Sequence, residues 1–121
     1  MSSLGDILIG AGQVAAGTGV AIGAHDAYGG AMVTVAGVLA LMSAQEAEMA
    51  AAWRVADIAA MRTLLGRPAA TDDLSLGALD ATWADLSRDL IAHHAGMDGD
   101  DAAILAFYRD STQRRELAWP Q

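Results

Sequence analysis

The sequence predicts an all-α protein, in which a Gly/Ala-rich helical hairpin is followed by three amphipathic helices. Two observations lead to this prediction. Two uncharged runs, Ile7–Ala24 and Ala27–Ala44, would each form a helix roughly 27 Å long, and only His25 and Asp26 separate them. From Gln45 onward charged residues are frequent, and the apolar residues recur at helical spacing. We therefore divide the chain into an apolar hairpin, residues 1–44, and an acidic amphipathic region, residues 45–121.

The hairpin has the dimensions of a membrane-spanning element. Each run is close to the ~30 Å hydrocarbon thickness of a bilayer. Gln13, Thr18 and the many Gly and Ala residues make insertion only marginally favourable, so burial in a large protein assembly such as a virion component is an equal alternative. The first six residues contain no Lys or Arg, and we expect no secretory signal.

The glycines of the hairpin are regularly spaced. A glycine inside a helix costs roughly 0.8 to 1 kcal/mol relative to Ala, so close packing must offset the cost. Small residues seven apart lie on one helix face and let two backbones approach. Three series have this spacing: Gly5, Gly12 and Gly19; Gly10 and Gly17; Gly23, Gly30 and Gly37. We expect these eight glycines to form a helix-packing interface with a partner helix, although a compositional bias toward Gly and Ala would also enrich them.

The first amphipathic helix is expected over Ala44–Leu65. Its apolar stripe contains Met49, Trp53, Ala56 and Ala60. Nothing separates it from the preceding run, which leaves open whether the two are one helix. Gly66 should supply a left-handed cap, and Pro68 prevents continuation.

Two further helices complete the prediction. Thr71 is the expected N-cap of the first, and Gly96 is its expected end. Its stripe comprises Leu76, Leu79, Trp83, Leu86 and Leu90. The last helix should begin near Asp98 or Asp100 and run to about Leu117. We expect it to bury Ile104 and Phe107, with Leu105 and Tyr108 as further candidates.

An α+β fold with short strands at 6–10 and 32–37 is the alternative, because Val33 and Val35 are β-branched and glycines flank both segments. The first segment runs into Gly10–Ala15, which fits the G-x-G-x-x-A dinucleotide-binding pattern. That pattern needs an acidic residue after the next strand, where Ala36 and Gly37 stand instead. We therefore expect no cofactor.

Composition excludes several classes of function. The net charge of -8 disfavours binding to nucleic acid, whose phosphates attract basic proteins. The same charge would suit a basic protein partner, which is a further alternative. Without cysteine, the chain has no disulfide, thiolate ligand or cysteine nucleophile.

The histidines suggest a metal site only weakly. His93 and His94 precede Asp98, Asp100 and Asp101, but adjacent histidines on a helix point about 100° apart. We expect no metal and no catalytic residues. A small metal- or cofactor-binding enzyme subunit that uses His93, His94 or His25 is the alternative.

The predicted function is that of a non-enzymatic structural or assembly subunit. It would be a homo-oligomer or part of a larger complex, either in a membrane or within a large assembly. Trp119 is difficult to bury within one subunit and is a candidate partner contact. If the hairpin is inserted, Arg54, Arg62 and Arg67 place both of its ends on the cytoplasmic side.

Overall fold

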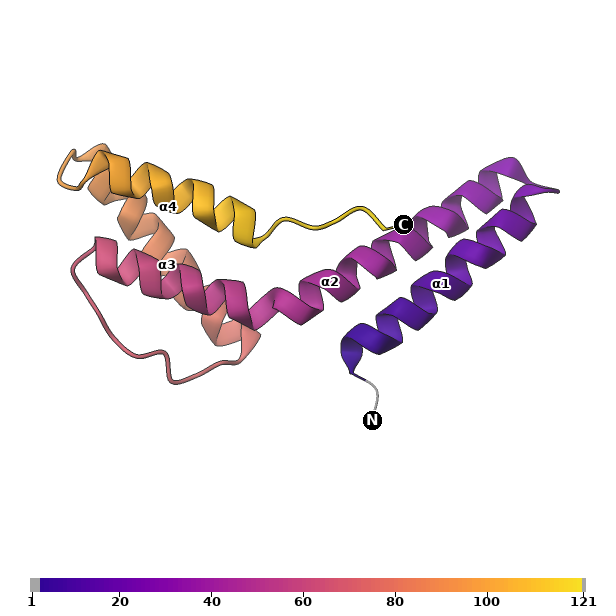
Figure 1. Ribbon diagram of the computed structural model, residues 1–121, viewed down its shortest axis with the longest axis horizontal. Helices are drawn as coiled ribbons and strands as arrows, with labels where there is room; N and C mark the ends of the chain where they lie inside the picture. The colour runs from indigo at the N-terminus through magenta and orange to yellow at the C-terminus, as the bar shows by residue number, and fades with distance from the viewer. Residues whose placement is uncertain (1–2, 121) are drawn as a thin grey trace. The chain divides into compact units, whose positions relative to one another are not determined.

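The computed structural model describes residues 3–120 and contains helices but no strand in that range. The helices are α1 (Leu4–Gly23), α2 (Ala27–Leu64), α3 (Leu76–Ala95) and α4 (Asp101–Arg114) (Figure 1). The all-α prediction is confirmed. The α+β alternative is wrong, because residues 6–10 lie in α1 and residues 32–37 lie in α2. Two short strands would have lacked partners, whereas each segment as a helix satisfies its own backbone groups.

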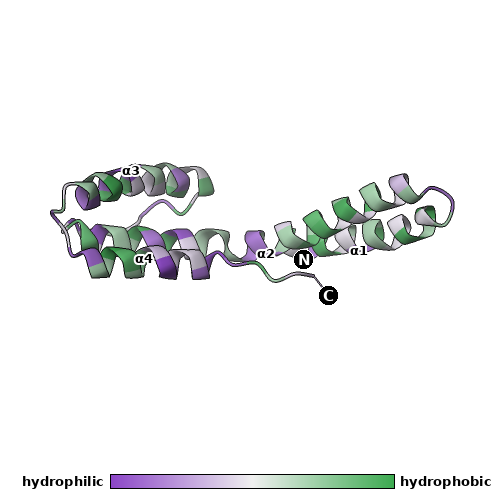
Figure 2. Ribbon diagram, turned by 90° about the horizontal axis from the view of Figure 1, so that it is seen from above, coloured by the Kyte–Doolittle hydropathy of each residue, from purple (hydrophilic) through white to green (hydrophobic). Residues whose placement is uncertain are grey.

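The chain forms two compact units. The hairpin unit contains the residues up to Glu48 together with the segment that begins at Leu117. The three-helix unit is Met49–Glu116. The boundary falls within α2, so this helix contributes to both units. Figure 2 shows apolar residues along the hairpin and hydrophilic residues recurring along α3 and α4.

Both hairpin helices begin at a polar cap. The Ser3 hydroxyl accepts a hydrogen bond from the Asp6 backbone N–H at 3.1 Å, and the Asp6 carboxylate accepts one from the Ser3 N–H at 3.0 Å. This reciprocal capping box satisfies two otherwise unpaired donors at the start of α1. The Asp26 carboxylate accepts a bond from the Gly29 N–H at 3.0 Å, just inside α2. The predicted turn between the two runs is therefore present, and its polar residues start the second helix.

The second run and the first amphipathic stretch form one helix, so the chain has four helices in its described part rather than five. Between Gly37 and Leu64 there is no glycine or proline, and nothing interrupts the backbone hydrogen bonds. The end of the helix is as predicted. Gly66 has a left-handed φ of 67°, and the Arg67 N–H donates to the Arg62 carbonyl at 2.8 Å. These features are typical of a Schellman cap.

The start of α3 differs from the prediction. Ser75, not Thr71, is the N-cap, and its hydroxyl accepts from the Ala78 N–H at 3.4 Å. Thr71 lies in the preceding loop, where its hydroxyl accepts a bond from Arg62 Nη1 at 3.2 Å. Arg62 also donates to the Ala69 carbonyl at 3.1 Å. These hydrogen bonds of Arg62, to residues seven to nine positions further along the chain, hold the loop against the end of α2.

Asp73 in this loop provides a test of pH dependence. The Ser75 backbone N–H donates to its carboxylate at 2.9 Å, and this bond, with a contribution from the Ser75 hydroxyl, lowers the pKa of Asp73. A lowered pKa means that the bonds stabilise the fold above the ordinary pKa of Asp and are lost as the pH falls through the lowered value. We expect carboxyl-carbon NMR to show an Asp73 midpoint below the ordinary one, partly restored in Ser75→Ala. A midpoint at or above the ordinary value would contradict the bonded geometry.

The last helix begins where the sequence predicts and ends early. Asp100 is the N-cap, and its carboxylate accepts from the Ala103 N–H at 3.1 Å. The helix ends at Arg114 rather than near Leu117. The residues from Leu117 onward leave the three-helix unit and pack with the hairpin unit, which requires an extended chain.

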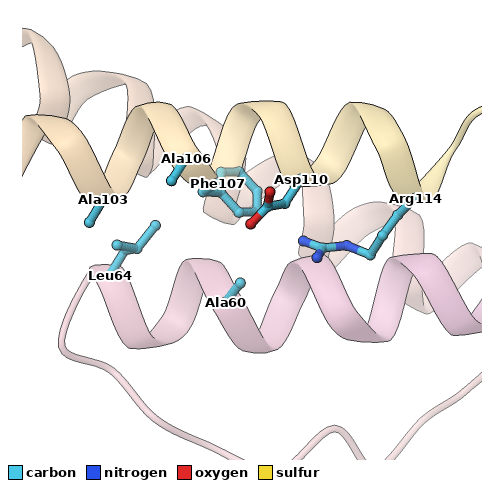
Figure 3. A pocket seen from close by; sticks show the side chains of 7 residues that line it. All are labelled: Ala60, Leu64, Ala103, Ala106, Phe107, Asp110 and Arg114. Carbon is cyan, nitrogen blue, oxygen red and sulfur yellow. The ribbon is translucent and has the colours of Figure 1, made fainter.

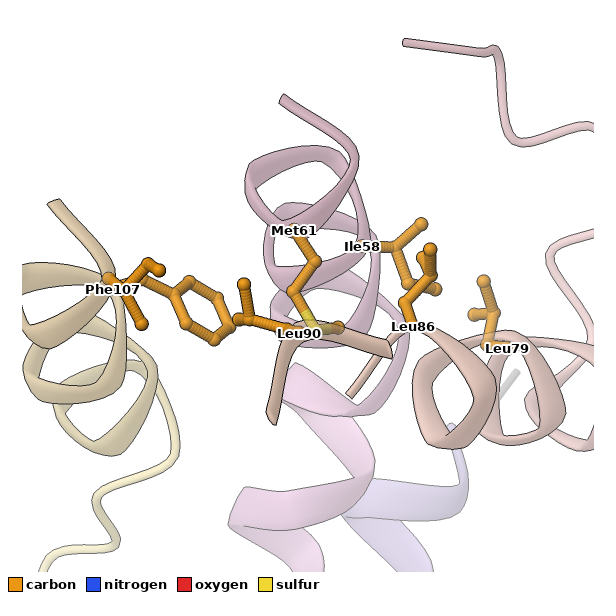
Figure 4. Close-up of a cluster of buried hydrophobic side chains, with 7 residues drawn as sticks. Ile58, Met61, Leu79, Leu86, Leu90 and Phe107 are labelled. Carbon is orange, nitrogen blue, oxygen red and sulfur yellow. The ribbon is translucent and has the colours of Figure 1, made fainter. Parts of the chain in front are cut away.

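The core of the three-helix unit joins all three of its helices. Figure 4 shows the side chains converging from α2, α3 and α4. The buried members are Ile58 and Met61, Leu79, Leu86 and Leu90, and Ile104 and Phe107. The predicted stripes are thus confirmed at these positions, whereas Leu76 and Leu105 are exposed. Trp53 is buried, and the ring of Trp83 packs edge-on against it.

Candidate functional site

The two helices of the hairpin meet along a row of small residues, which we call the glycine seam. In α1 the buried residues are glycines, and in the part of α2 that belongs to the hairpin unit they are two glycines and an alanine. The members are Gly5, Gly12 and Gly19 in α1 and Gly30, Gly37 and Ala44 in α2. The seven-residue spacing repeats on both helices, and their antiparallel register places Gly12 opposite Gly37 and Gly19 opposite Gly30.

The backbones in the seam are too close for a larger residue. A Cβ atom added at Gly12 would lie 2.8 Å from the Gly37 carbonyl oxygen. One added at Gly37 would lie 2.6 Å from the Ala16 nitrogen and 2.7 Å from the Gly12 oxygen. Since these neighbours are backbone atoms of the facing helix, they cannot rotate away. Close approach of this kind supplies the dispersion contacts that offset the poor helix propensity of glycine.

The remaining predicted interface glycines do not lie in the seam. A Cβ added at Gly10, Gly17 or Gly23 would meet no heavy atom within 4 Å. An added Cβ would therefore clash within the chain at five of the eight glycines and would enter open space at the other three. Gly23 still contacts α2 through its backbone, because a Cβ built at Gly30 would lie 2.5 Å from the Gly23 nitrogen. We call Gly10 and Gly17 the outward glycines, and contact with a second chain remains a prediction.

The outer surface of the hairpin is apolar. Val14 is 70% exposed and Val20 is 74% exposed, although both lie in the middle or last part of a long helix. The other exposed large apolar residues of α1 and the first half of α2 are Leu4, Ile7, Ile9, Tyr28, Met32, Val35 and Leu39. In a soluble bundle such residues would face inward. Here the fully buried residues are the small ones, and most of the large apolar residues are exposed.

Both hairpin helices have the length and composition of a membrane span. α1 and the apolar part of α2 pass this test, and only 17% of either apolar stretch is buried within the protein. Charged residues lie at the margins: Asp6 near the start, Asp26 in the turn, and Glu46 and Glu48 after the second apolar run. The uncharged surface is thus continuous between two polar levels.

The segment that follows α4 contacts the hairpin at Trp119. Its indole lines an apolar groove of about 290 Å³ on α2, together with Val35, Val38, Leu39 and Met42. The candidate partner-contact residue therefore lies against its own chain, but it stays 71% exposed.

The three-helix unit holds a buried carboxylate that the sequence reasoning missed. Asp57 of α2 is fully buried. Its carboxylate accepts hydrogen bonds from Trp83 Nε1 of α3 at 3.0 Å, Ser111 Oγ of α4 at 2.5 Å and Arg114 Nε at 2.9 Å. A signal was present, because Asp57 follows Trp53 by four residues and interrupts an otherwise apolar stripe. One buried carboxylate thus joins α2, α3 and α4.

A surface groove of about 280 Å³ lies between α2 and α4 (Figure 3). Its walls are Ala60, Leu64, Ala103, Ala106 and Phe107, with Asp110 and Arg114 at one end. Both charged groups have partners: Arg114 bonds to Asp57, and Asp110 contacts Arg109 at 3.3 Å. The groove therefore presents no converging groups of the kind that bind or activate a substrate.

The histidines form no metal centre in the described part of the chain. Among residues 3–120 there is no group of three His, Cys, Asp or Glu side chains arranged to hold a metal ion. His94 Nε2 lies 2.6 Å from Asp101 Oδ1, which links the end of α3 to the start of α4. His93 lies beside Gly99, and His25 is exposed in the hairpin turn.

Comparisons of this chain with protein-family models, with characterised proteins and with solved structures found no significant match. The physical features of the hairpin are therefore the basis for assigning a function.

Proposed function

We propose that this protein is a non-enzymatic assembly subunit whose helical hairpin is inserted in a membrane. The observation that carries the proposal is the reversed packing of the hairpin, with glycines in the seam and large apolar side chains outside. Exposure of that apolar surface to water is unfavourable. Large exposed apolar patches therefore indicate a surface that contacts another protein or a bilayer. In lipid, small residues at the helix contact and apolar residues outside are the expected arrangement.

Insertion as a pair explains how a glycine-rich helix can span a bilayer. Alone, α1 contains five interior glycines, Gln13 and Thr18, which make its transfer into lipid marginal. The seam supplies contacts that α1 would lack alone, and the helices satisfy their own backbone hydrogen bonds, as a bilayer requires. We therefore expect the hairpin to insert as one unit rather than as two independent helices.

Charge sets the expected orientation. Arg54, Arg62 and Arg67 follow the hairpin within about twenty residues, whereas the turn has no Lys or Arg. By the positive-inside rule, we expect both ends of the hairpin on the cytoplasmic side of the membrane and the His25–Asp26 turn on the opposite side. The acidic three-helix unit would then be cytoplasmic.

The outward glycines support self-association within the membrane. Gly10 and Gly17 are seven residues apart on α1, and the space next to each is open. A second helix can approach closely at such a position without displacing a side chain. Homo-oligomerisation along this face of α1 is thus part of the proposal.

Site-specific labelling tests insertion directly. The chain has no cysteine, so one introduced thiol carries a unique environment-sensitive fluorophore. We expect the label at Val14→Cys to move to shorter emission wavelength and to be quenched by brominated phosphatidylcholine vesicles. The matched control is Ile91→Cys on α3, which is also exposed and apolar but belongs to the three-helix unit. Its emission should not change.

Two results would contradict the proposal. The first is that the labels at Val14→Cys and Ile91→Cys respond equally to the vesicles, or that neither responds. The second is a Val14 label that is already shielded without lipid, in a particle containing several chains, which would place the hairpin in a protein assembly instead.

A further inference from the structure

The side chain of Gln45 holds the segment after α4 against the hairpin. Gln45 Nε2 donates to the Ala118 carbonyl at 2.7 Å, and Gln45 Oε1 accepts from the Ala118 N–H at 2.8 Å. A single amide thus satisfies both backbone groups of Ala118. An extended segment beside apolar surface needs such pairing, because unsatisfied backbone groups are costly there.

This pairing fixes the position of the next residue. Trp119 borders a hollow on α2 that Val35, Val38, Leu39 and Met42 also line, while most of its surface stays open. Because Trp119 is 71% exposed, most of its surface is available for contact with another molecule. The surrounding surface of the hairpin is apolar, so the exposed side of the ring is continuous with it.

The position of Trp119 along the axis of the hairpin indicates which environment its exposed surface contacts. The apolar run of α2 ends at Ala44, and Gln45 and Glu46 begin the polar part. At 1.5 Å per residue, Leu39 lies roughly 9 Å below Gln45 along the helix axis. The indole therefore lies just inside the end of the apolar run. Tryptophan is enriched at this level in membrane proteins, because its ring is apolar and its N–H is polar.

We propose that Trp119 is an interfacial membrane anchor, and that Gln45 is the residue that positions it at the boundary between lipid headgroups and acyl chains. The inference rests on the proposed function, since it requires an inserted hairpin. It adds that the segment from Leu117 to Trp119 contributes to the membrane-binding surface. The ligand is the bilayer interface itself.

Depth-dependent quenching of tryptophan tests this anchor. The full chain is placed in phosphatidylcholine vesicles brominated either near the carbonyl end or near the methyl end of the acyl chain. Subtracting the emission of Trp119→Phe from that of the wild type isolates the Trp119 signal from Trp53 and Trp83. We expect the isolated signal to lose more intensity with the shallow bromines than with the deep ones.

Gln45→Ala tests the positioning role. It should abolish the difference between shallow and deep quenching while the Trp119 ring is still present. Gln113→Ala is the matched control, because Gln113 is exposed on α4 in the three-helix unit. That variant should leave the depth profile unchanged.

The outcomes separate this inference from the proposed function. If the Val14→Cys label reports insertion but the isolated Trp119 signal is not quenched, or is quenched more by deep bromines, the anchor is overturned and the inserted hairpin stands. An unchanged profile in Gln45→Ala overturns the positioning role. If the Val14→Cys label stays in water, both proposals fall together.

Discussion

Gly37→Ala should separate the two helices of the hairpin, although it adds only one methyl group. The new Cβ would lie 2.6 Å from the Ala16 nitrogen and 2.7 Å from the Gly12 oxygen, and neither backbone atom can move without shifting α1. Overpacking of this kind costs about 3 kcal/mol, of which better helix propensity returns only about 1 kcal/mol. We expect a net loss of about 2 kcal/mol, measured by SDS titration of the full chain in mild-detergent micelles. Spin labels at Ile9→Cys and Leu39→Cys should show a longer and broader interhelix distance.

Gly17→Ala is the matched control. It makes the same change in the same hairpin, but no heavy atom lies within 4 Å of the added Cβ. In micelles that hold one chain each, where the proposed association through Gly17 is absent, it should leave the interhelix distance unchanged and raise stability by up to about 1 kcal/mol. If both variants behave alike, the glycine seam is not what holds the hairpin together.

The sequence indicated which glycines share a helix face but not what they face. A spacing of seven residues places Gly5, Gly12 and Gly19 in one row whatever the surroundings. The opposing helix is identified only by the register of the hairpin, which the turn at His25 and Asp26 sets. In the structure the helix that faces Gly12 and Gly19 is α2 of the same chain. Contact of the hairpin glycines with a second chain stays a prediction.

Helix boundaries were predictable where the local chemistry decides them. Gly66 and Asp100 act as expected, because a left-handed glycine and an N-capping carboxylate depend on neighbouring residues alone. Thr71 does not cap α3, and its hydroxyl accepts a hydrogen bond from Arg62, nine residues earlier in the chain. Similarly, the end of α4 depends on where Ala118 finds its partner, Gln45. Long-range contacts of this kind leave no periodic signal in a sequence.

The buried carboxylate of the three-helix unit predicts the second large effect. Asp57→Ala removes the acceptor for Trp83, Ser111 and Arg114 at once and leaves their buried or partly buried donors without a partner. Breaking a buried ion pair by deleting one partner costs about 3 to 5 kcal/mol. Arg114 is partly exposed and can turn toward water, so we expect about 3 kcal/mol. The measurement is urea unfolding of the full chain in mild detergent, followed by near-UV circular dichroism of the Trp53–Trp83 pair.

Two further variants give the effect a scale. Asp57→Asn keeps an oxygen that accepts from Trp83 and Ser111 but loses the charge that pairs with Arg114, so its loss should be intermediate. Asp85→Ala also removes a carboxylate that contacts an arginine, but both partners are exposed. Its effect should stay within about 0.5 kcal/mol, because such surface pairs contribute little. If Asp57→Ala were no more damaging than Asp85→Ala, the three helices would be held by their apolar contacts alone, and the hydrogen bonds around Asp57 would add nothing to the stability.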